Sequence, residues 1–485
     1  MKKRDYYQTD YKTILIIILA LIFLYRLLVL SNAKVDLYID EAYYYNWAKH
    51  LDFGYYSKPP MLSLLIAFTT WLFGDGVLAI KIGANLVYPI TSYIIFLIAK
   101  ELFDERVAFY SAVSFFTLPS IWLSSLIIST DVVLLLFWAL AMLFFIKALK
   151  SDRLFDWVMA GVFSGFGLLS KYNFIFFIFS VVLIFLKVPK YRNYYKSRGF
   201  YIAIVLAFII FLPNLWWNYQ NGFISFVHTK EISHIDRSLF HPSHFLEFFG
   251  AQFGIFGPIF FFYFWVMIFK GAVFKDDRYF ILFSFSIVLL GFIMSLSMLS
   301  RSFANWAAPV YISATIMVVA YLLKHNKRYL IIFSILLHSL LGMGLYHYKD
   351  IAKFLSIDLT RKSDPYHRVL GWSEIISKVK VIRDRYPNYY ILSKSRGDVA
   401  ELDYYLKEKS YIFNPKKQME NQYHLDRDLN ELRGEDFIYV GDKKDLKLLK
   451  PYFVKVKWIK SISVRVDSDY NRSYDIFEAK GFKGY

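Results

Sequence analysis

Two adjacent carboxylates and a lysine stand out in a polar segment between the first two apolar stretches of this 485-residue chain. Asp40 and Glu41 precede a run of aromatic residues, and Lys58 comes directly before Pro59 and Pro60. Charged residues crowded between apolar stretches indicate a functional site at a membrane face. A carboxylate at such a face can act as a general base, or can orient an acceptor or a metal ion.

Each of these residues also has a purely structural interpretation. Adjacent side chains on a helix point about 100° apart, so Asp40 and Glu41 need not share a role, and one of them could serve the helix N-terminus. Lys58, held at a fixed depth by the prolines, suits a phosphate ligand. A lysine that extends from a membrane helix toward water would look the same. The sequence alone leaves both interpretations open.

Three further charged residues lie at the ends of apolar stretches. Asp131 follows Ser129 and Thr130 at the start of one stretch, where helix capping and the helix dipole would also explain it. Lys171 lies in the short turn between two stretches and suits a helix C-terminus. Arg301 lies between two later stretches, and a guanidinium is the usual choice for bidentate contact with phosphate.

The histidines of the 214–244 segment do not follow a zinc pattern. His228, His234, His241 and His244 have spacings that fit no standard zinc motif, so a histidine metal site is not expected. The chain also lacks a Walker A sequence, a Rossmann glycine pattern and a nucleophile elbow in a suitable context. A nucleotide-driven pump and a nucleotide-sugar enzyme are therefore not supported.

The composition predicts a polytopic α-helical membrane protein. Hydrophobic residues make up 57% of the chain and aromatic residues 20%, and the mean hydropathy is +0.37. The apolar residues come in long blocks, unlike those of an ordinary soluble protein. The net charge of +18 is typical of residues that set topology and contact anionic lipids, and no soluble basic module suggests nucleic-acid binding. Because there is no cysteine, disulfides and thiol chemistry are excluded.

The apolar blocks predict about eleven transmembrane helices. Residues 60–73 form a shorter block, which is expected to be re-entrant or interfacial. Ser31, Asn32 and Ala33 resemble a signal-peptidase site, but the preceding block is long and Arg26 interrupts it, so we expect the first helix to be retained. The expected spans are residues 14–30, 77–100, 106–124, 131–149, 155–169, 172–187, 200–213, 245–270, 279–299, 303–323 and 329–347.

The distribution of basic residues predicts the orientation of these helices. With the N-terminus inside, twenty Lys and Arg residues fall in the inside segments and eight in the outside segments, as the positive-inside rule requires. Treating residues 60–73 as a full crossing would disturb this alternation. The first loop, Asp131, Lys171, the 214–244 segment and Arg301 then all fall on the outer face.

The composition changes at about residue 349. The apolar blocks shrink to strand length, at 389–392, 411–413, 437–440 and 463–466, and alternate with polar helical stretches such as 398–406. The chain is therefore expected to have a transmembrane catalytic domain over 1–348, with its first outer loop at 31–60, and a periplasmic α/β domain over 349–485.

The order of these motifs resembles one enzyme family. Asp-Glu-Ala-Tyr-Tyr at 40–44 is followed by Gly-Tyr-Tyr-Ser-Lys-Pro-Pro-Met at 54–61, Thr-Asp at 130–131, Leu-Leu-Ser-Lys-Tyr at 168–172, Leu-Pro-Asn at 212–214 and Asn-Trp at 305–306. This ordered set resembles the bacterial protein-mannosyltransferase-like membrane glycosyltransferases of the GT-C fold, which include the aminoarabinose lipid A transferases. The resemblance extends more weakly into the C-terminal domain, at Gly371-Trp372 and around Arg396.

The resemblance implies a sugar donor linked to polyprenyl phosphate, transfer on the outer face of the bacterial inner membrane, and a lipid, glycan or protein acceptor. Asp40 would be the main catalytic carboxylate, Glu41 would shape the same catalytic site, and Asp131 would be a second catalytic carboxylate. Many relatives carry histidine at the position of Lys58. No cofactor is certain, although a divalent cation is possible. The implied substrate-binding residues are Lys58, Lys171, Tyr172, Arg301, Tyr55 and Asn218.

Two other classes of protein remain as alternatives. A secondary transporter would carry charges near the bilayer midplane on broken helices, together with internal repeats. Here the charges lie near the ends of the apolar stretches, and no repeat is visible. A flippase-like or assembly protein without transferase activity would use the aromatic first loop only as a docking surface.

Overall fold

The computed structural model describes residues 10–32, 35–232 and 240–485, which form two compact units. Unit 1 contains residues 1–32, 58–65 and 81–346, and unit 2 contains residues 33–57, 66–80 and 347–485. The boundary between the units passes through helices α3 (Met61–Phe73) and α4 (Val77–Leu102). Several residues used in the charge, signal-peptidase and histidine arguments lie outside the described residues, namely Lys2, Lys3, Arg4, Ala33, Lys34, His234 and Arg237.

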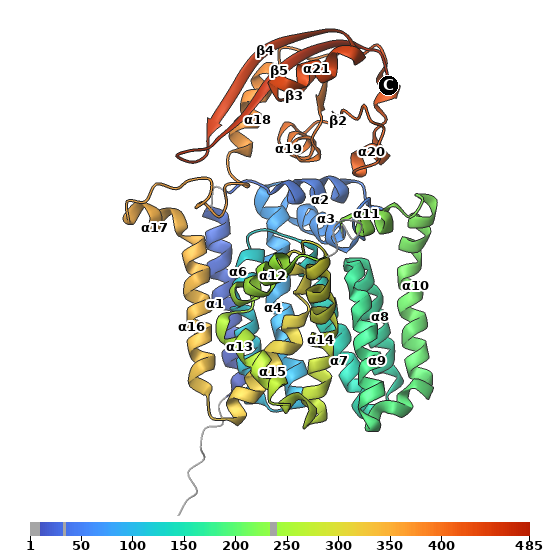
Figure 1. Ribbon diagram of the computed structural model, residues 1–485, viewed down its shortest axis with the longest axis vertical. Coiled ribbons are helices and arrows are strands. Elements are labelled where there is room, and N and C mark those ends of the chain that lie inside the picture. The colour runs from blue at the N-terminus through green and yellow to red at the C-terminus, as the bar shows by residue number, and fades with distance from the viewer. Residues whose placement is uncertain (1–9, 33–34, 233–239) are drawn as a thin grey trace, which may run out of the picture. The chain divides into compact units, whose positions relative to one another are not determined.

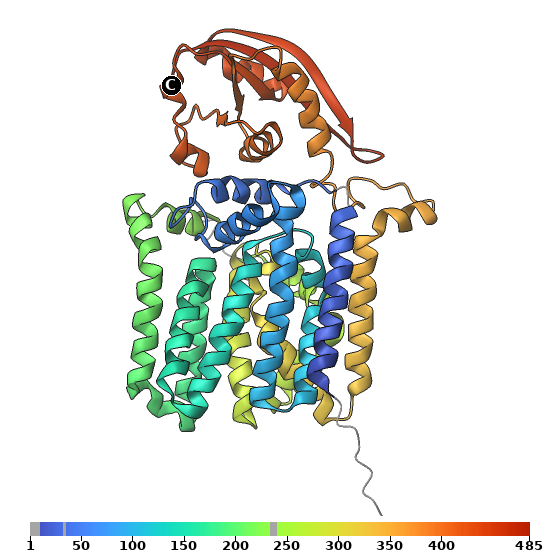
Figure 2. The ribbon, with the colours of Figure 1, turned by 180° about the vertical axis from the view of Figure 1, so that it is seen from behind.

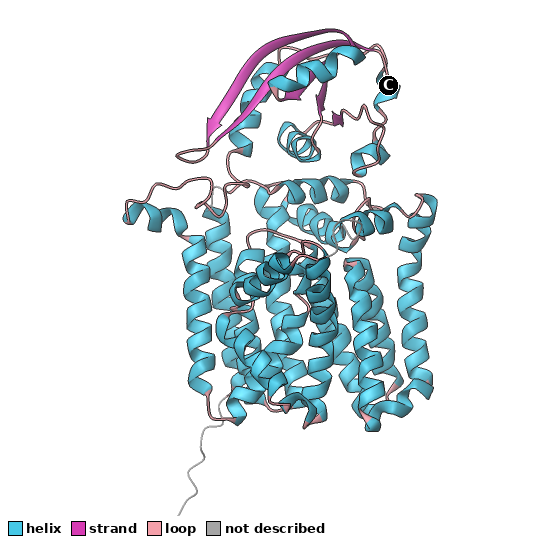
Figure 3. Ribbon diagram, in the orientation of Figure 1, coloured by secondary structure: helices cyan, strands magenta, loops and turns pink. Residues whose placement is uncertain are grey.

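Unit 1 is a bundle of helices whose long members lie side by side (Figures 1 and 3). Short 3-10 helices join some of them, including η1 (Tyr172–Phe174), η2 (Pro189–Lys196) and η4 (Ala304–Ala307). The α-helices besides α3 and α4 are α1 (Tyr11–Asn32), α5 (Glu105–Phe116), α6 (Pro119–Ser124), α7 (Thr130–Ser151), α8 (Leu154–Ser170), α9 (Ile175–Lys187), α10 (Arg198–Gln220), α11 (Ile224–Ile232), α12 (Pro242–Ile255), α13 (Pro258–Phe269), α14 (Asp277–Leu299), α15 (Val310–Lys324) and α16 (Arg328–Tyr346).

The long helices divide into a buried and an exposed set. Helices α4, α7 and α14 are mostly buried within the unit, whereas α1, α10 and α16 expose most of their apolar side chains. Leu28 of α1, Phe208 of α10 and Leu340 of α16, for example, are more than half exposed. Exposed apolar faces of this length are expected where a helix meets lipid. The protein is therefore a multi-pass membrane protein with a lipid-facing periphery.

Two of the predicted spans are broken in the structure. Residues 106–124 form α5 and α6, separated at Thr117–Leu118, and residues 245–270 form α12 and α13, which are bent by 116° at Phe256–Gly257. Both second helices begin with proline, which cannot donate the backbone hydrogen bond that a continuous helix needs. Six described helices are long and apolar enough to cross a membrane, or up to eight if each bent pair counts as one span.

The break after α5 explains a buried arginine in the membrane. Arg26 of α1 is 1% exposed, and its guanidinium lies 4.3 Å from the ring centroids of Phe116 and Trp122. One of its nitrogens, Nη2, donates to the carbonyl of Phe116 at 2.8 Å. That carbonyl ends α5 and has no partner further along the helix, so a cation there is stabilising. Arg26 is accordingly a structural residue of the bundle.

The predicted 214–244 loop is largely helical. Helix α10 continues through Pro213 to Gln220, and residues 224–232 form α11. A proline in a helix leaves one carbonyl unpaired but does not force the helix to end, and here the apolar sequence continues past it. Asn214 and Asn218 therefore lie one helical turn apart on α10 rather than in a loop.

Unit 2 contains a mixed five-stranded sheet with the order β2-β1-β3-β5-β4 (Figures 1 and 2). Strand β1 pairs in parallel with β2 and β3, while β5 pairs antiparallel with β3 and β4. The strands are β1 (Tyr390–Ser393), β2 (Ser410–Ile412), β3 (Phe437–Gly441), β4 (Phe453–Arg465) and β5 (Asn471–Phe482). The predicted strand at 463–466 is thus the end of a much longer strand. The helices of the unit are α2 (Ile39–Lys49), α17 (Tyr348–Phe354), α18 (Trp372–Arg383), α19 (Arg396–Leu406), α20 (Gln422–Asp426) and α21 (Leu446–Leu449).

Neighbouring residues of a strand point to opposite faces of the sheet, and in β1 and β3 neighbouring residues are buried, so these strands are covered on both faces. Ile391 and Ile438 pack with α18 and α19 in one apolar core. Leu392 and Phe437 pack on the other face in a second core. The resulting three layers make a compact α/β unit, as the alternation of strand-sized and helical stretches predicts.

The first polar segment of the chain is built into this unit. Asp36 accepts hydrogen bonds from the backbone N–H of Trp372 at 2.8 Å and from the hydroxyl of Tyr405 at 3.1 Å. The backbone N–H of Tyr56 donates to the side-chain carbonyl of Gln422 at 2.6 Å. Helix α2 therefore has a fixed position against the C-terminal sequence, which a loop that only joins two membrane helices would lack.

Candidate active site

Asp40 and Glu41 have different environments in the first turn of α2. The Glu41 side chain is fully buried, and its Oε2 accepts a hydrogen bond from the backbone N–H of Tyr38 at 2.8 Å. That contact belongs to a capping box, in which a glutamate satisfies a backbone donor before the helix. The Asp40 side chain remains 38% exposed. Of the two carboxylates, Asp40 is therefore the one that a substrate can reach.

Asp40 is paired with an arginine from the C-terminal sequence. Nη2 of Arg396 lies 2.9 Å from Oδ1 of Asp40. Arg396 is the first residue of α19, directly after the parallel strand β1, and Gly397 follows it. A Cβ at Gly397 would lie 2.9 Å from Cγ2 of Ile39, so glycine permits the close approach of α19 to α2. This approach places Arg396 within reach of Asp40.

The position of Arg396 has a topological basis. Strand β1 lies between β2 and β3, so the connections from β1 to β2 and from β2 to β3 run in opposite directions across the sheet. In open α/β sheets, ligands bind outside the carboxyl ends of the strands at such a reversal. Arg396 therefore occupies the end of the sheet at which this fold type presents binding groups.

The guanidinium of Arg396 is held as a cation. It lies 4.7 Å from the ring centroid of Tyr43. Burial acts to lower the pKa of Arg396, but the Asp40 carboxylate and the neighbouring tyrosines outweigh it, so the pKa is raised above its usual value. A charged partner at this distance orients the Asp40 carboxylate, as an acceptor-orienting group requires.

Tyr55 has a structural environment. Its hydroxyl interacts with the carbonyls of Trp47 and His50 and accepts from the backbone N–H of Asp52. Its ring stacks on Trp47 at a centroid distance of 4.5 Å. Because these contacts use the hydroxyl and the residue is 2% exposed, Tyr55 supports the shape of the loop after α2.

Unit 1 contains a second polar group, centred on Asp131. Nζ of Lys171 lies 2.7 Å from Oδ1 of Asp131, and Nδ2 of Asn305 donates to Oδ2 at 2.8 Å. The Asp131 and Lys171 side chains are only 5% and 12% exposed. These contacts join the start of α7, the end of α8 and the η4 segment. Asp131 and Lys171, predicted separately from the sequence, therefore form one buried ion pair.

Polar residues of α4 fix the segment that leads into Asp131. The buried ammonium group of Lys81 donates to the carbonyl of Leu126 at 3.0 Å, and Asn85 donates to the carbonyl of Ser125 at 2.9 Å. Residues 125–129 are not α-helical, so these carbonyls need partners other than a continuing helix. A small cavity of about 20 Å³, lined by Asp131 among others, adjoins the group. The buried Asp131 side chain thus borders a small cavity inside unit 1.

Tyr172 and Asn218 belong to a neighbouring hydrogen-bond cluster. Nδ2 of Asn218 donates to the Tyr172 hydroxyl at 3.3 Å and to the carbonyl of Asn214 at 3.0 Å. The Tyr172 hydroxyl also donates to the side-chain carbonyl of Asn214 at 3.3 Å. Tyr172 follows Lys171 directly, so this cluster fixes the turn that carries the lysine.

Lys58 and Arg301 are the other two predicted cations of unit 1. Lys58 is partly buried just before α3. Arg301 lies between α14 and η4, where its Nη2 is 3.2 Å from Oε1 of Glu247. Both side chains of that pair are more than half exposed. An exposed ion pair of this kind contributes little to stability and can exchange its partner for a ligand.

The predicted carboxylates do not form a metal site. Asp40 is paired with Arg396, and Asp131 with Lys171 and Asn305. Among residues 10–32, 35–232 and 240–485, no group of three or more His, Cys, Asp or Glu side chains is arranged to hold a metal ion. A divalent cation takes several oxygen ligands, and the described surroundings of Asp40 and Asp131 do not supply them.

Two residues of these groups were not among the predicted site residues. Asn305 lies in the Asn-Trp motif at 305–306, and Arg396 lies at the start of the Arg-Gly-Asp sequence that follows β1. Both motifs are visible in the sequence, but their partners, Asp131 and Asp40, are 174 and 356 residues away. Only the folded chain brings them together.

Comparisons with known proteins agree on one kind of enzyme. Residues 57–217 match the family described as dolichyl-phosphate-mannose-protein mannosyltransferase. The lipid A galacturonosyltransferase RgtD of Rhizobium johnstonii is 30% identical over 393 residues, covering 80% of this chain and 81% of that protein. The lipopolysaccharide core galacturonosyltransferase RgtB of the same organism is 28% identical over 187 residues, covering 38% of this chain and 37% of that protein.

Solved structures share the fold at much lower identity. The crystal structure of ArnT from Cupriavidus metallidurans in the apo state has a TM-score of 0.68 and 12% identity, covering 96% of this chain and 98% of ArnT. ArnT bound to undecaprenyl phosphate gives the same TM-score, with 97% and 98% coverage. Together with the extended identity to the Rhizobium enzyme, these results confirm the predicted fold class in its main features. The chain belongs to the protein-mannosyltransferase-like family of membrane glycosyltransferases.

Proposed function

We propose that this glycosyltransferase moves a uronic-acid-type sugar from a polyprenyl phosphate donor to a lipid A-like acceptor. The extended similarity to a lipid A galacturonosyltransferase is the observation that carries this proposal. The ArnT complex with undecaprenyl phosphate, a protein of the same fold, supports a polyprenyl phosphate as the donor carrier. The family membership disfavours the transporter and flippase-like alternatives.

In the proposed reaction an acceptor oxygen attacks the anomeric carbon of the sugar, and the bond from that carbon to the polyprenyl phosphate breaks. Asp40 orients the acceptor and takes its proton, while Arg396 holds the carboxylate in position. The departing phosphate gains negative charge, which cations stabilise. Lys58, Lys171 and Arg301 are the proposed cations for this role, with Tyr172 and Asn218 holding the Lys171 turn.

A transfer assay tests the substrate proposal directly. Purified protein in detergent is given polyprenyl phosphate carrying galacturonic acid, or the same carrier with a neutral hexose, together with lipid A. Mass spectrometry of the lipid should show addition of one uronic acid from the first donor. Transfer of only the neutral sugar would refute the donor proposal, and modification of protein but not lipid would refute the acceptor.

The orientation is proposed from the charge asymmetry of the sequence. We expect the N-terminus to be cytoplasmic and residues 349–485 to be periplasmic, with about eleven crossings in all. Reporter enzymes that act only in the periplasm can be fused after residue 349 and, separately, within residues 187–198. The first fusion should be active and the second inactive. Activity of the second would contradict both the orientation and the outer-face location of Asp131 and Lys171.

Replacing Arg301 with alanine should weaken donor binding without unfolding the protein. Its partner Glu247 is exposed, so loss of their ion pair is expected to cost about 0–1 kcal/mol of unfolding free energy. Loss of a charge-assisted contact to phosphate should raise the apparent KM for the donor about tenfold. Lys58→Ala should act similarly. Glu247→Gln is the matched control, because it breaks the same pair while leaving the arginine. An unchanged donor KM in both cation variants would leave them as structural residues.

A further inference from the structure

Helix α17 presents apolar side chains on its exposed side. Phe354 is 87% exposed, Ile351 lies on the same face one helical turn earlier, and Leu355 follows the helix directly. Both Ile351 and Leu355 are also exposed, and so is Ile357, two residues further along the chain. Exposed apolar residues are normally scattered singly, and a contiguous group of them marks an interaction surface. These four residues form the α17 patch.

The other side of α17 packs within unit 2. Ala352 is buried, and the Tyr348 hydroxyl donates to Oδ2 of Asp364 at 3.1 Å. The ring centroid of Tyr348 also lies 5.2 Å from that of Tyr366. Because Tyr348 and Ala352 are four residues apart, they share one face of the helix. The helix cannot turn its exposed apolar residues inward without losing these contacts.

The end of α17 holds Ile357 in the patch. Ser356 has a positive φ of 54°, and its backbone N–H donates to the carbonyl of Lys353 at 3.2 Å. The backbone N–H of Ile357 donates to the carbonyl of Ala352 at 2.8 Å. These two hydrogen bonds form a Schellman motif, which turns the chain back at the end of a helix. Ile357 is therefore held next to the last turn of α17, which carries Phe354.

The patch follows directly on a membrane helix. Helix α16 ends at Tyr346, and α17 begins at Tyr348. The 19 residues of α16 are about 28 Å long, close to the thickness of about 30 Å of the hydrocarbon core, so α16 ends near the lipid headgroups. Leu340 and Met343, near this end, are exposed apolar residues of its lipid-facing surface. One linking residue and the seven residues of α17 keep the patch within about 20 Å of that end. The patch is thus continuous along the chain with a surface that faces lipid.

The charges around the patch suit an anionic surface. The segment 347–362 carries four basic residues against two acidic ones, namely Lys349, Lys353, Arg361 and Lys362 against Asp350 and Asp358. Within the part of the chain that the structure describes, none of the four basic residues forms an ion pair with a carboxylate. Asp350 lies 3.7 Å from His347. The excess of basic residues favours contact with anionic lipid headgroups.

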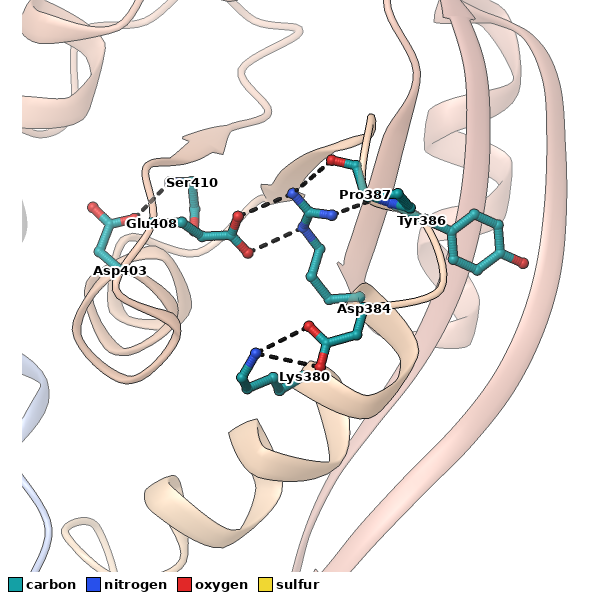
Figure 4. Close-up of polar contacts among 8 residues, drawn as sticks. Lys380, Asp384, Tyr386, Pro387, Asp403, Glu408 and Ser410 are labelled. Carbon is teal, nitrogen blue, oxygen red and sulfur yellow. Dashed lines mark hydrogen bonds and ion pairs between the residues drawn. The ribbon is translucent and has the colours of Figure 1, made fainter.

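Helix α18 of the same unit provides a contrast. Val381 is also an exposed apolar residue between basic residues. There Lys380 lies 3.0 Å from Asp384, and Glu408 accepts two hydrogen bonds of 3.0 Å from Arg383 (Figure 4). A single exposed apolar residue whose basic neighbours are already paired needs no further partner. The α17 patch differs both in its size and in its charges.

We propose that the α17 patch docks on the surface of the bilayer that α16 crosses. Its apolar side chains enter the boundary between headgroups and acyl chains, while Lys349 and Lys353 extend toward the lipid phosphates. A second copy of the chain is disfavoured, because a stable protein interface takes about 20–30 residues from each partner and the patch is much smaller. The contact holds unit 2, which carries Asp40 and Arg396, at the membrane surface, and it requires neither donor nor acceptor.

A spin label can measure this contact, because the chain has no cysteine of its own. Ser356→Cys places the label within the patch and keeps all four apolar side chains. Ser377→Cys on α18 is the matched control, because Ser377 is also exposed and lies one helical turn from Val381. The full-length protein is placed, one copy each, in nanodiscs of phosphatidylcholine and phosphatidylglycerol. The collision rates of each label with oxygen, which concentrates in lipid, and with a water-soluble nickel complex are then compared.

At residue 356 we expect frequent collisions with oxygen and several-fold fewer collisions with the nickel complex than at residue 377, because a polar complex is excluded from lipid. Few collisions with both reagents would mean that protein covers the patch. Frequent collisions with the nickel complex would mean that the patch is open to water. Either of these two results would overturn the proposal.

The decisive variant adds Ile351→Ser/Phe354→Ser to the labelled Ser356→Cys protein. The nickel collision rate at residue 356 should then rise to that at residue 377. Because both replaced side chains are exposed, the melting temperature should remain near that of the wild type, which separates loss of docking from unfolding. Val381→Ser removes an exposed apolar side chain elsewhere in unit 2 and should leave the rate at residue 356 unchanged. A double variant with the same nickel collision rate as its parent would contradict docking through the patch.

Discussion

Replacing Asp131 with asparagine should destabilise the membrane unit strongly. Lys171 would keep its charge in a site where it is 12% exposed and would lose the carboxylate 2.7 Å away. Removing one partner of a buried ion pair typically costs about 3–5 kcal/mol, because the remaining charge is left without compensation. The expected result is a clear fall in the melting temperature of the purified protein in detergent.

The double variant Asp131→Asn/Lys171→Met separates stability from function. Methionine carries no charge, so the double variant leaves no buried charge without a partner. Most of the stability lost in Asp131→Asn should therefore return. Transfer activity should remain low, because the proposed phosphate contact is absent. Glu247→Gln, which breaks the exposed pair with Arg301, should change the melting temperature little. If the double variant were no more stable than Asp131→Asn, the contact would not be an energetically coupled pair.

The same pair shows what sequence reasoning can establish about this site. Asp131 and Lys171 each lie at the end of an apolar stretch, where the helix dipole gives an adequate explanation for either one alone. Their pairing depends on α7 and α8 running antiparallel and on the turn at Lys171 pointing back toward α7. Such tertiary relations are not encoded in the local pattern, so the residues were predicted and their contact was not.

The division of roles between Asp40 and Glu41 follows a similar logic. Their adjacency on a helix predicts that one carboxylate caps the helix and the other is available, but not which one. The choice depends on the extended conformation of Tyr38, which brings its N–H to the Glu41 carboxylate. Arg396, 356 residues further along, could not be assigned to Asp40 from the sequence. Long-range charge partners need the fold.

The sequence predicted a helix best where the apolar stretch has the length of one membrane span and contains no break. Helices α4, α7 and α14 correspond closely to predicted spans, whereas 106–124 and 245–270 are each divided by a proline. The proline signals were visible, but the length of the apolar run outweighed them in the prediction. Strand β4 was recognised only at its end, because its exposed lysines interrupt the apolar pattern. Lysines of this kind are common on an edge strand, where they oppose pairing with other chains.

Asp40→Asn should lower the rate of sugar transfer by about a hundredfold or more, the effect expected for loss of one acid-base group. Asparagine retains the size of the side chain and an oxygen that can accept from Arg396. Because both partners of the Asp40–Arg396 pair are 38% exposed, the stability of the protein should change by about 1 kcal/mol at most. The measurement compares initial transfer rates and melting temperatures of the purified wild type and variant.

Two further variants decide whether Asp40 acts in chemistry or only joins α2 to α19. Asp36→Asn is the matched control, because Asp36 lies in the same segment but its carboxylate is bound to Trp372 and Tyr405. It should lower stability while the folded protein keeps its transfer rate. Arg396→Gln breaks the ion pair but leaves the Asp40 carboxylate, so it should slow transfer less than Asp40→Asn does. Equal losses in Asp40→Asn and Arg396→Gln would mean that the pair acts as a structural link, and a near wild-type rate in Asp40→Asn would remove Asp40 from the reaction.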